Sequence, residues 1–529
     1  MGSVLPEQVE PLLSPENNVH PDEIRGETDL PAPKRRLAIS ILCIVILAAV
    51  DSGFLEVLIP LTRIYENIVC TQWYTLHDPT ALKPGVDPPE QICKIEPVQS
   101  ELAFLRGFEG LFITLPSLLL AVPYGLLADK TGRKPVLLMS VLGLLFAITF
   151  VLVVCAFPNV FPLRMVWASW AFTFIGGGAP VGLSMIMTMV SDTVKPSQRS
   201  TVFFHIAIGL LLAQVGATAV ASTVMKYGSP WMAVGIGYIS LLVASCFSLI
   251  IPETKHYKHE GEEDELGQES DDRDSPESVS LITQPTDDDS MSSTSSASWK
   301  DSPSSSIRRG TAYMTEAFGF LLKDARLLAV TTTFFFNTIG TAVLSIGVQY
   351  ISNRFHWTIA DANLLFSLRA AVNAILFIFI LPSITWFVNK YYHLTTNAKD
   401  LYLAKASVLF LPVGFFIMAF AASVSLMTTG LMIMTLGTGY SSLMRSLVTS
   451  MVAKEYTARL YGAITGIEML GSMISGPVLA GLFQWGIHLG GSWQGIPFFA
   501  GGLMMTLTAS LTWTVRLVST ETKEPEAEE

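Results

Sequence analysis

Long apolar runs alternate with short polar segments along most of the chain, from residue 37 to residue 516. A run of about 20 apolar residues is long enough for a helix that crosses the hydrocarbon core of a bilayer. We therefore predict an all-α integral membrane protein with twelve transmembrane helices. The predicted spans are 37–62, 100–128, 136–156, 164–190, 202–225 and 231–251, then 327–351, 362–388, 402–422, 426–452, 460–484 and 494–516.

Basic residues test this count, because loops on the cytoplasmic side of a membrane carry an excess of Lys and Arg. An even number of spans puts both termini on one side. With that side cytoplasmic, 24 of the 33 Lys and Arg residues fall there. A miscounted helix would invert every later loop, so the asymmetry favours twelve spans with both termini inside. Six basic residues fall in outer loops and three inside spans: Arg63, Lys83, Lys94, Arg164, Lys226 and Arg354, then Arg106, Arg369 and Arg445.

Composition agrees with this topology. The chain of 529 residues is 50% hydrophobic and 15% charged, with a mean hydropathy of +0.47. Soluble domains carry about 25% charged residues. The net charge of −11 arises between residues 260 and 290, where 13 acidic residues face one basic residue. The acidity therefore indicates nothing about a partner.

The polar stretches set the predicted domain boundaries. A segment rich in acid and serine cannot bury enough apolar surface to fold, so we expect a disordered linker between two membrane units. The expected units are a cytoplasmic N-terminal tail (1–36), an N-terminal six-helix bundle (37–252), a cytoplasmic linker (253–323), a C-terminal six-helix bundle (324–517) and a cytoplasmic tail (518–529).

The two halves carry matching residues at nearly one offset, which indicates a duplicated architecture. Each pair occupies the same place in the predicted topology. We therefore expect two six-helix bundles with a solute path between them. The pairs are Leu105-Arg106-Gly107 with Leu368-Arg369-Ala370, Met189-Val190 with Met451-Val452, Arg199 with Arg459, and Gly209 with Gly471.

The loop between the second and third spans reads Gly-Leu-Leu-Ala-Asp-Lys-Thr-Gly-Arg-Lys-Pro over residues 125–135. Gly125 permits close helix approach and Gly132 permits a tight turn. Arg133 and Lys134 hold the loop in the cytoplasm, and Asp129 can face the positive N-terminus of a neighbouring helix. In a duplicated twelve-span chain, this loop resembles the signature loop of the major facilitator superfamily.

The resemblance covers residues 35 to about 518 and implies a gating role for the loop. Asp129 would cap helix 11, Arg133 would join a cytoplasmic charge network, and Arg459 is the nearest partner. These contacts would close the inner gate while the cavity faces outward. Within the superfamily the chain resembles fungal transporters of small organic molecules, most of all exporters of drugs or secondary metabolites. Helix 5 lacks the glycine-proline motif of many drug/proton antiporters, which leaves antiport and direction open.

Charges inside the spans are costly, about 2.5–3.5 kcal/mol each on insertion scales, so each needs an explanation. Asp51 lies about 21 Å into helix 1 at 1.5 Å per residue and is a candidate proton carrier. Its alternative is a static, hydrogen-bonded carboxylate. Glu56 is expected to face water near the outer surface. Arg445 and Glu468 lie at matched depths, so a salt bridge is favoured there, although Glu468 is a second proton-coupling candidate.

Substrate contacts are less well defined by the sequence. Arg106 and Glu109 can pair along one face of helix 2, as a structural ion pair or as a substrate contact. Arg369 repeats Arg106 but has only Asn373 four residues on, which makes Arg369 a candidate for holding an anionic group. Tyr440 is a candidate to line an aromatic cavity. Residues 176–178 are all glycine and should bend helix 4 near mid-membrane.

Other groups complete the predictions. Cys70 and Cys93 share an outer loop where a disulfide can form. The sequence shows no phosphate-binding loop, metal-ligand motif or nucleophile elbow, so we expect no enzyme, no metal, no cofactor and no nucleic-acid partner. The expected partners are a small organic solute, the lipid bilayer, and protons as the coupling ion, for a monomer in the plasma membrane or, alternatively, a vacuolar or endosomal membrane. Proton-coupled uptake of a nutrient or organic anion, and a non-transporting nutrient sensor, remain alternative functions.

Overall fold

The computed structural model describes residues 33–83, 86–194, 196–255, 325–392, 396–452 and 457–515. The predictions for the two tails and most of the linker lie outside these residues. Within the described ranges every regular element is a helix. Eleven helical segments are long and apolar enough to cross a membrane. The predicted tenth span is helical too, but a turn divides it into two shorter pieces. The twelve-span fold is therefore confirmed.

The first half holds six helical segments, and the fourth is broken. They are α1 (Pro33–His77), α2 (Glu96–Thr131), α3 (Arg133–Ala156), the broken segment η4 (Leu163–Ser169), α4 (Trp170–Thr173) and α5 (Gly178–Thr193), then α6 (Pro196–Tyr227) and α7 (Pro230–Ile250).

The second half holds the other six. They are α10 (Ala325–Ala342) with η6 (Val343–Ile346) and α11 (Gly347–Phe355); α12 (Ile359–Ile375) with a π-helical turn η7 (Leu376–Ile380) and α13 (Leu381–Tyr392); α14 (Thr396–Ala419); α15 (Val424–Leu436) with α16 (Tyr440–Ser450); α17 (Thr457–Leu489); and η9 (Gly491–Gly495) with α18 (Ile496–Thr514).

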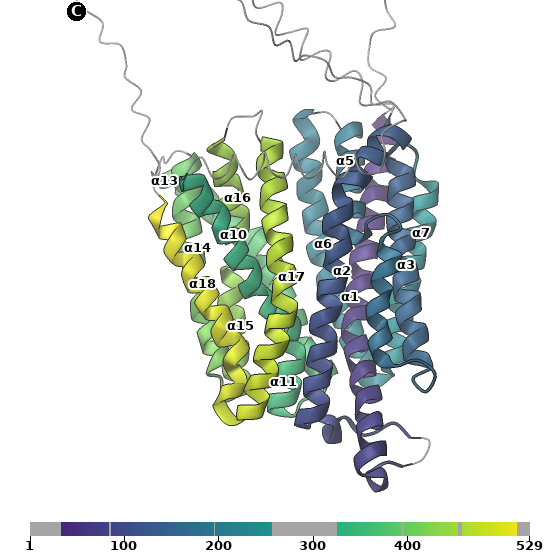
Figure 1. Ribbon diagram of the computed structural model, residues 1–529. Coiled ribbons are helices and arrows are strands. Elements are labelled where there is room, and N and C mark those ends of the chain that lie inside the picture. Colours follow the sequence, from purple (N-terminus) through teal and green to yellow (C-terminus); the bar gives the residue numbers. More distant parts are fainter. Residues whose placement is uncertain are drawn as a thin grey trace, which may run out of the picture.

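Figure 1 shows the two halves as separate sets of helices lying side by side. Contacts between them run mainly along two helix pairs, α2 with α17 and α6 with α12. The described chain begins and ends on one side, which we call the terminal side; it also carries the loop between α2 and α3. The opposite side, which we call the far side, carries the loop that follows α1.

Three helices begin on the far side at a Ser or Thr that caps the first helical turn. Ser229, Thr358 and Ser423 each accept a hydrogen bond from the backbone N–H three residues later, at the starts of α7, α12 and α15. Such a cap satisfies one of the unpaired N–H groups of a first helical turn. The polar loops between the apolar runs therefore define the helix ends.

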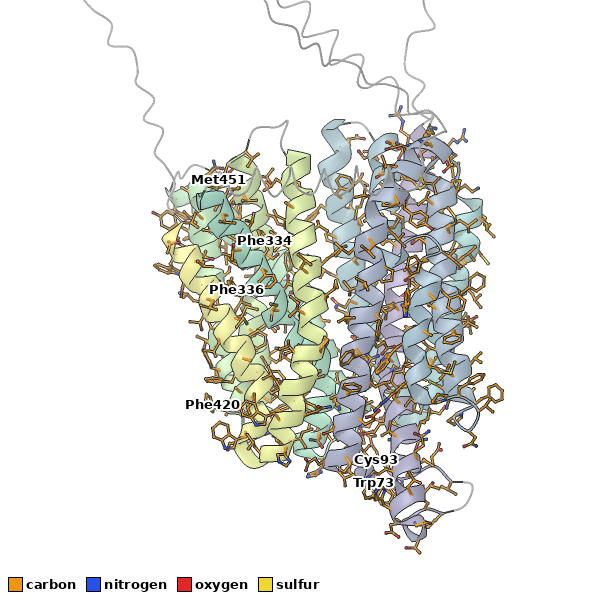
Figure 2. The ribbon with its side chains drawn as sticks, in the orientation of Figure 1. Trp73, Cys93, Phe334, Phe336, Phe420 and Met451 are labelled. Carbon is orange, nitrogen blue, oxygen red and sulfur yellow. A yellow bond between two sulfur atoms is a disulfide. The ribbon has the colours of Figure 1, made fainter. Side chains whose placement is uncertain are left out.

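Side chains divide into buried cores and an exposed apolar coat. The N-terminal bundle has one core cluster toward the far side, around Tyr65, and another toward the terminal side, around Met189. A third cluster, around Phe415, fills the C-terminal bundle and extends to Ala103, Met225 and Ala233 of the N-terminal bundle. Many large apolar residues remain exposed, such as Phe420 at the edge of the C-terminal bundle (Figure 2). An apolar coat of this extent is typical of a surface that faces lipid.

Candidate functional site

One carboxylate, Glu253, holds the loop between α2 and α3. Its two oxygens accept hydrogen bonds from the backbone N–H groups of Arg133 at 2.9 Å and Lys134 at 3.1 Å, at the start of α3. Gly132 has a φ of +106°, and a Cβ on it would overlap this carboxylate. The predicted tight turn is present, and it needs glycine both for its conformation and for space.

The same contacts fix the charge of Glu253, which lies just beyond the membrane-spanning part of α7. Burial raises the pKa of its carboxyl, but hydrogen bonds from four backbone N–H groups lower it, and the pKa lies below the ordinary 4.5. The side chain is therefore ionised at neutral pH and complements the positive end of α3. The donors are Arg133, Lys255, Lys134 and Thr254.

Arg133 anchors a charge cluster within the N-terminal bundle. Arg133 is 2% exposed, and its Nε makes an ionic contact of 3.1 Å with Asp192 Oδ2 in α5. A second nitrogen lies 3.6 Å from Asp129 Oδ1. The side chain also donates to the carbonyl oxygen of Ala128. These contacts tie α2, α3 and α5 of the N-terminal bundle together.

Two expectations for this loop concern contacts of Asp129 and Gly125 with neighbouring helices. The Asp129 side chain is 62% exposed and, among the described residues, contacts Arg133 and not helix 11, which is α17. No atom of the described residues lies within 4 Å of a Cβ placed on Gly125, so the close helix approach expected there stays a prediction. The expected contacts belong to a closed inner gate, and on this side no hydrogen bond or ion pair joins described residues of the two bundles to one another. The side chain of Arg459 lies outside the described residues.

On the far side, polar side chains join the two bundles. Gln349 Nε2 donates to the backbone oxygen of Gln99 at 2.9 Å, and Lys226 Nζ lies 2.6 Å from Asp361 Oδ1. All hydrogen bonds and ion pairs that described residues make with one another between the bundles lie on this side. The remaining ones are Gln91 with His356, Glu90 with Ser352 and Ile359, Asn363 with Thr218 and Ser222, Gln484 with Ser100, and His488 with Glu96.

Glu90 is the most connected residue of this far-side seal. Its Oε1 accepts hydrogen bonds from the backbone N–H of Ile359 at 2.7 Å and from Lys94 Nζ at 2.9 Å. The next residue, Gln91, donates to the backbone oxygen of His356 at 2.9 Å. A short segment of the first loop is therefore fastened to the turn between α11 and α12.

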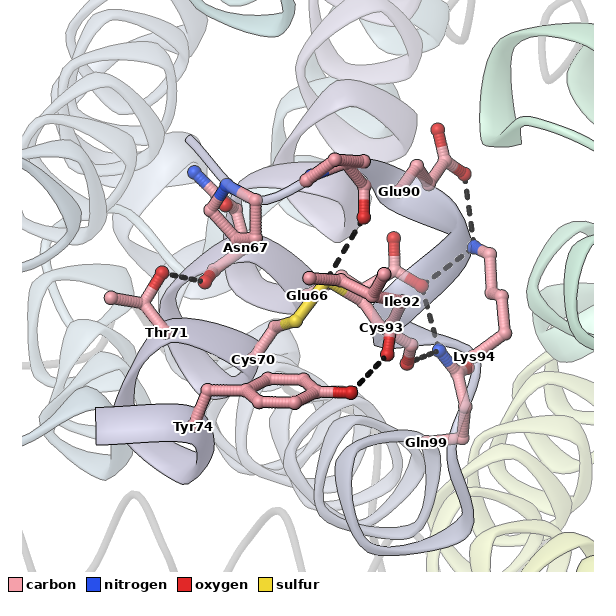
Figure 3. Close-up of a disulfide and its surroundings, with 12 residues drawn as sticks. Glu66, Asn67, Cys70, Thr71, Tyr74, Glu90, Ile92, Cys93, Lys94 and Gln99 are labelled. Carbon is pink, nitrogen blue, oxygen red and sulfur yellow. Dashed lines mark hydrogen bonds and ion pairs between the residues drawn. A yellow bond between two sulfur atoms is a disulfide. The ribbon is translucent and has the colours of Figure 1, made fainter. Parts of the chain in front are cut away.

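The segment with Glu90 is itself held by Glu66 and by a disulfide (Figure 3). Glu66 is fully buried and accepts hydrogen bonds from Arg63, Lys94 and Gln99. Cys70 of α1 and Cys93 are joined by a disulfide across 23 residues. The ion pairs and the disulfide therefore hold this part of the first loop in place. Breaking a buried ion pair would leave an uncompensated charge, which is costly.

The two proton-coupling candidates differ in their surroundings. Asp51 of α1 is partly exposed and has no hydrogen bond or ion pair among the described residues. Glu468 of α17 pairs with Arg445 of α16 at 2.6 Å, the ion pair that the matched depths favour. Glu56, expected to face water, is instead 7% exposed, because α1 packs closely on Gly237 of α7 there. Asp51 is thus the carboxylate that is accessible and lacks a partner.

Arg106 and Glu109 form an ion pair of 2.8 Å inside the N-terminal bundle. Tyr65 of α1 donates to Glu109 at 3.1 Å, and Arg106 also donates to the backbone oxygen of Leu58. Glu109 lines a cavity of about 50 Å³. Pockets that hold drug-sized ligands measure about 300–1,000 Å³, so this cavity is too small for such a solute. The geometry favours the structural alternative for this pair.

Tyr440 is packed inside the C-terminal bundle. The residue is fully buried in the C-terminal bundle, and its hydroxyl lies 2.8 Å from the Thr512 hydroxyl of α18. Tyr440 is the first residue of α16, and the turn before it directs the ring toward α18. The prediction of a substrate contact at Tyr440 therefore finds no support in this conformation.

Arg369 and Asn373 lie one helical turn apart on α12. Asn373 Oδ1 accepts a hydrogen bond of 2.7 Å from Thr438, in the turn that divides α15 from α16. Arg369 is partly exposed, and its buried Nε has no hydrogen-bond partner among the described residues. Asn373 is therefore bound to its neighbouring helix, whereas Arg369 is not.

The fourth and tenth spans are broken at equivalent positions. The fourth is interrupted at residues 174–177, as its glycines predict, and the tenth at residues 437–439. Gly176 and Gly437 are 261 residues apart, which matches the repeat offset. Interrupted helices at corresponding places in two halves are the best pointer to a transporter binding site.

Several residues of the far-side seal and of the Arg133 charge cluster were not predicted from the sequence. Glu66, Glu90 and Asp192 each depend on a partner distant in the sequence, and these partners are Lys94, Ile359 and Arg133 respectively. The break near Gly437 could have been found by applying the repeat offset to the glycines of helix 4. Among the described residues, no group of three or more His, Cys, Asp or Glu side chains could hold a metal ion.

Comparisons with known proteins agree with this architecture. Residues 102–476 match the family model of the Major Facilitator Superfamily. The chain is 31% identical to the MFS-type transporter aprT of Aspergillus flavus, over 89% of this chain and 87% of that protein. It is 26% identical to the MFS efflux pump atnC of Emericella nidulans, over 93% and 90%, and 29% identical to the efflux pump ustT of Aspergillus flavus, over 85% and 82%.

Solved structures show the same fold at low sequence identity. A mutant of the nucleoside transporter NupG matches with a TM-score of 0.59 at 13% identity, covering 90% of this chain and all of that chain. A D-xylose–proton symporter matches with a TM-score of 0.57 at 14% identity, covering 90% and 97%. The duplicated twelve-span fold, the loop at Gly132 and these matches together show that the chain belongs to the Major Facilitator Superfamily, whose members move small molecules across membranes.

Proposed function

We propose that this protein is a secondary active transporter that exports a small organic molecule by alternating access, driven by a proton gradient. One observation carries the proposal: in the described residues, the polar contacts between the bundles all lie on the far side. Seals that alternate between two sides are how such carriers move a solute. The distribution of basic residues favours a cytoplasmic terminal side. The conformation then corresponds to a carrier sealed outside and accessible from the cytoplasm.

Export is supported by the relatives. The proteins atnC and ustT are both called efflux pumps. Their names support a similar direction for this chain, from the cytoplasm outward. We place the protein in the plasma membrane as a monomer, with both termini inside.

Asp51 is the proton carrier in this proposal. A carboxyl within a membrane segment that has no fixed partner can change protonation without breaking an ion pair. Glu468, in contrast, has its charge balanced by Arg445. We therefore assign coupling to Asp51 and a structural role to the Arg445–Glu468 pair.

Flux into proteoliposomes under an imposed pH gradient tests the function. The full chain is reconstituted with a panel of organic solutes, with protein-free liposomes as the control for passive partition. A proton antiporter concentrates its solute in the acidic compartment, whatever its orientation, whereas a proton symporter concentrates it in the alkaline one. Accumulation in the alkaline compartment would contradict proton-driven export and would indicate proton-coupled uptake. No accumulation in either case, across the panel, would contradict transport.

A further inference from the structure

Arg369 is unlike the other two arginines that were predicted inside the spans. Arg106 pairs with Glu109, and Arg445 pairs with Glu468. The guanidinium of Arg369 has no carboxylate, no hydrogen-bond acceptor and no aromatic ring in contact, within the described part of the chain, although its Nε is buried. A charged group in a membrane segment is costly and is retained where it has a function.

The internal repeat shows what Arg369 lacks. Arg106 and Arg369 occupy equivalent positions, 263 residues apart. Three residues after Arg106 stands Glu109, its ion-pair partner, whereas three residues after Arg369 stands Val372. The N-terminal half thus neutralises its arginine internally, and the C-terminal half leaves the equivalent charge available.

The surroundings of Arg369 carry features of a binding site. One turn on, Asn373 is hydrogen-bonded to Thr438 in the break of the tenth span. Directly afterwards, residues 376–380 form a π-helical turn, a deviation that is frequent at functional sites. Two helices with irregular backbones therefore meet beside an unpaired cation.

We propose that Arg369 binds an anionic group, such as a carboxylate, of the transported solute. A guanidinium presents a planar fork of donors that matches a carboxylate with two parallel hydrogen bonds. Arg369 is partly exposed, so a solute beside α12 can reach it. The transported molecules are then organic anions. This inference rests on the proposed transport function and adds the class of solute.

The first test needs no ligand. Thermal unfolding is measured for the purified full chain, for Arg369→Gln and for the matched control Arg106→Gln. Arg106→Gln leaves Glu109 uncompensated and should lower the melting temperature. Arg369→Gln removes an unpaired charge and should raise it by about 1–3 °C. An Arg369→Gln variant destabilised like the control would mean that Arg369 has a structural partner, and would overturn the proposal.

The second test compares matched probes: 1-naphthoate with 1-naphthamide, and indole-3-acetate with indole-3-acetamide. The wild type should bind the carboxylate of each pair more tightly than the amide. Arg369→Gln should lower the affinity for the carboxylate by about tenfold or more and leave the affinity for the amide unchanged. Val372→Glu, which recreates the Arg106–Glu109 spacing, should also remove the preference for the carboxylate. A wild type without this preference in either pair, or a preference that survives in Arg369→Gln, would overturn the proposal.

Failure of the site and failure of the transport function remain distinguishable. Carboxylate-selective binding without flux in proteoliposomes contradicts transport but supports the site. Gradient-driven flux in which wild type and Arg369→Gln handle the carboxylate and the amide alike contradicts the site but supports transport.

Discussion

Gly107 of α2 and Gly476 of α17 bring the backbones of the two bundles into direct contact. A Cβ on Gly107 would lie 2.6 Å from the carbonyl oxygen of Gly476 and 2.7 Å from the side chain of Ala480. Glycine at both positions lets the helices approach at a distance that a side chain would prevent. The far-side seal therefore depends on close backbone packing as well as on polar contacts.

Replacing Gly107 with valine should wedge the far side open. The added side chain cannot fit against Gly476, so the population should shift toward a conformation open on the far side. Labelling of a cysteine introduced at Gln349, which lies in the seal, reports this shift. Gly110→Val is the matched control, because no atom of the described ranges lies within 4 Å of a Cβ there. Equal labelling in both variants would contradict the packing role of Gly107.

Glu90 should keep the far-side seal closed. Glu90→Gln keeps the shape of the side chain but removes the charge that pairs with Lys94 and holds the N–H of Ile359. We expect faster far-side labelling with little loss of stability. Glu101→Gln is the control, because Glu101 pairs with Arg164 on the exposed surface of the same bundle. If the two variants label at the same rate, Glu90 does not hold the seal.

The disulfide should stabilise the protein by restricting the unfolded chain. For the 23-residue separation of Cys70 and Cys93, the chain-entropy estimate is about 3 kcal/mol. The double variant Cys70→Ser, Cys93→Ser should unfold at a lower temperature than the wild type, and reductant should lower the unfolding temperature of the wild type but not of the double variant. Cys43→Ser, at a buried free cysteine, serves as a comparison. No difference with or without reductant would show that the bridge contributes nothing.

Glu253 should give a pH-dependent contribution to stability. Its pKa is lowered in the folded protein, so its contribution is present above the unfolded value, near 4.5, and is lost as the pH falls through the folded pKa. Glu253→Gln should therefore be destabilised by about 1 kcal/mol at pH 7, as for a lost helix cap. The difference from wild type should shrink in thermal unfolding below pH 4.5. A difference that stays constant down to pH 3 would contradict this account.

The periodic apolar runs were enough to predict the fold, because bilayer thickness imposes a minimum length on each span. They could not predict that α1 continues to His77, since that extension is polar and is stabilised by Glu66 and the disulfide. The glycines at 176–178 correctly predicted a break in helix 4. The ion pair of Arg445 with Glu468 also followed from depth alone.

The direction of individual side chains could not be predicted from the sequence. Tyr440 is packed against Thr512, and Glu56 is buried beside Gly237, because each is directed by a neighbour distant in the sequence. Residue spacing gives depth along a helix but not which helix lies opposite. For the same reason, the lack of a partner for Arg369 could be anticipated from its own helix but required the full packing to be established.

Solute-driven proton movement is the most direct measurement of the central claim. A solute that the transporter moves is added outside proteoliposomes that contain a trapped pH-sensitive dye, without an imposed gradient. For the wild type we predict that the lumen becomes more alkaline as solute enters and protons leave. With Asp51→Asn, solute exchange should continue while the lumen pH stays constant. Solute entry into wild-type vesicles without a change in lumen pH, or an unchanged pH response in Asp51→Asn, would contradict proton-coupled export through Asp51.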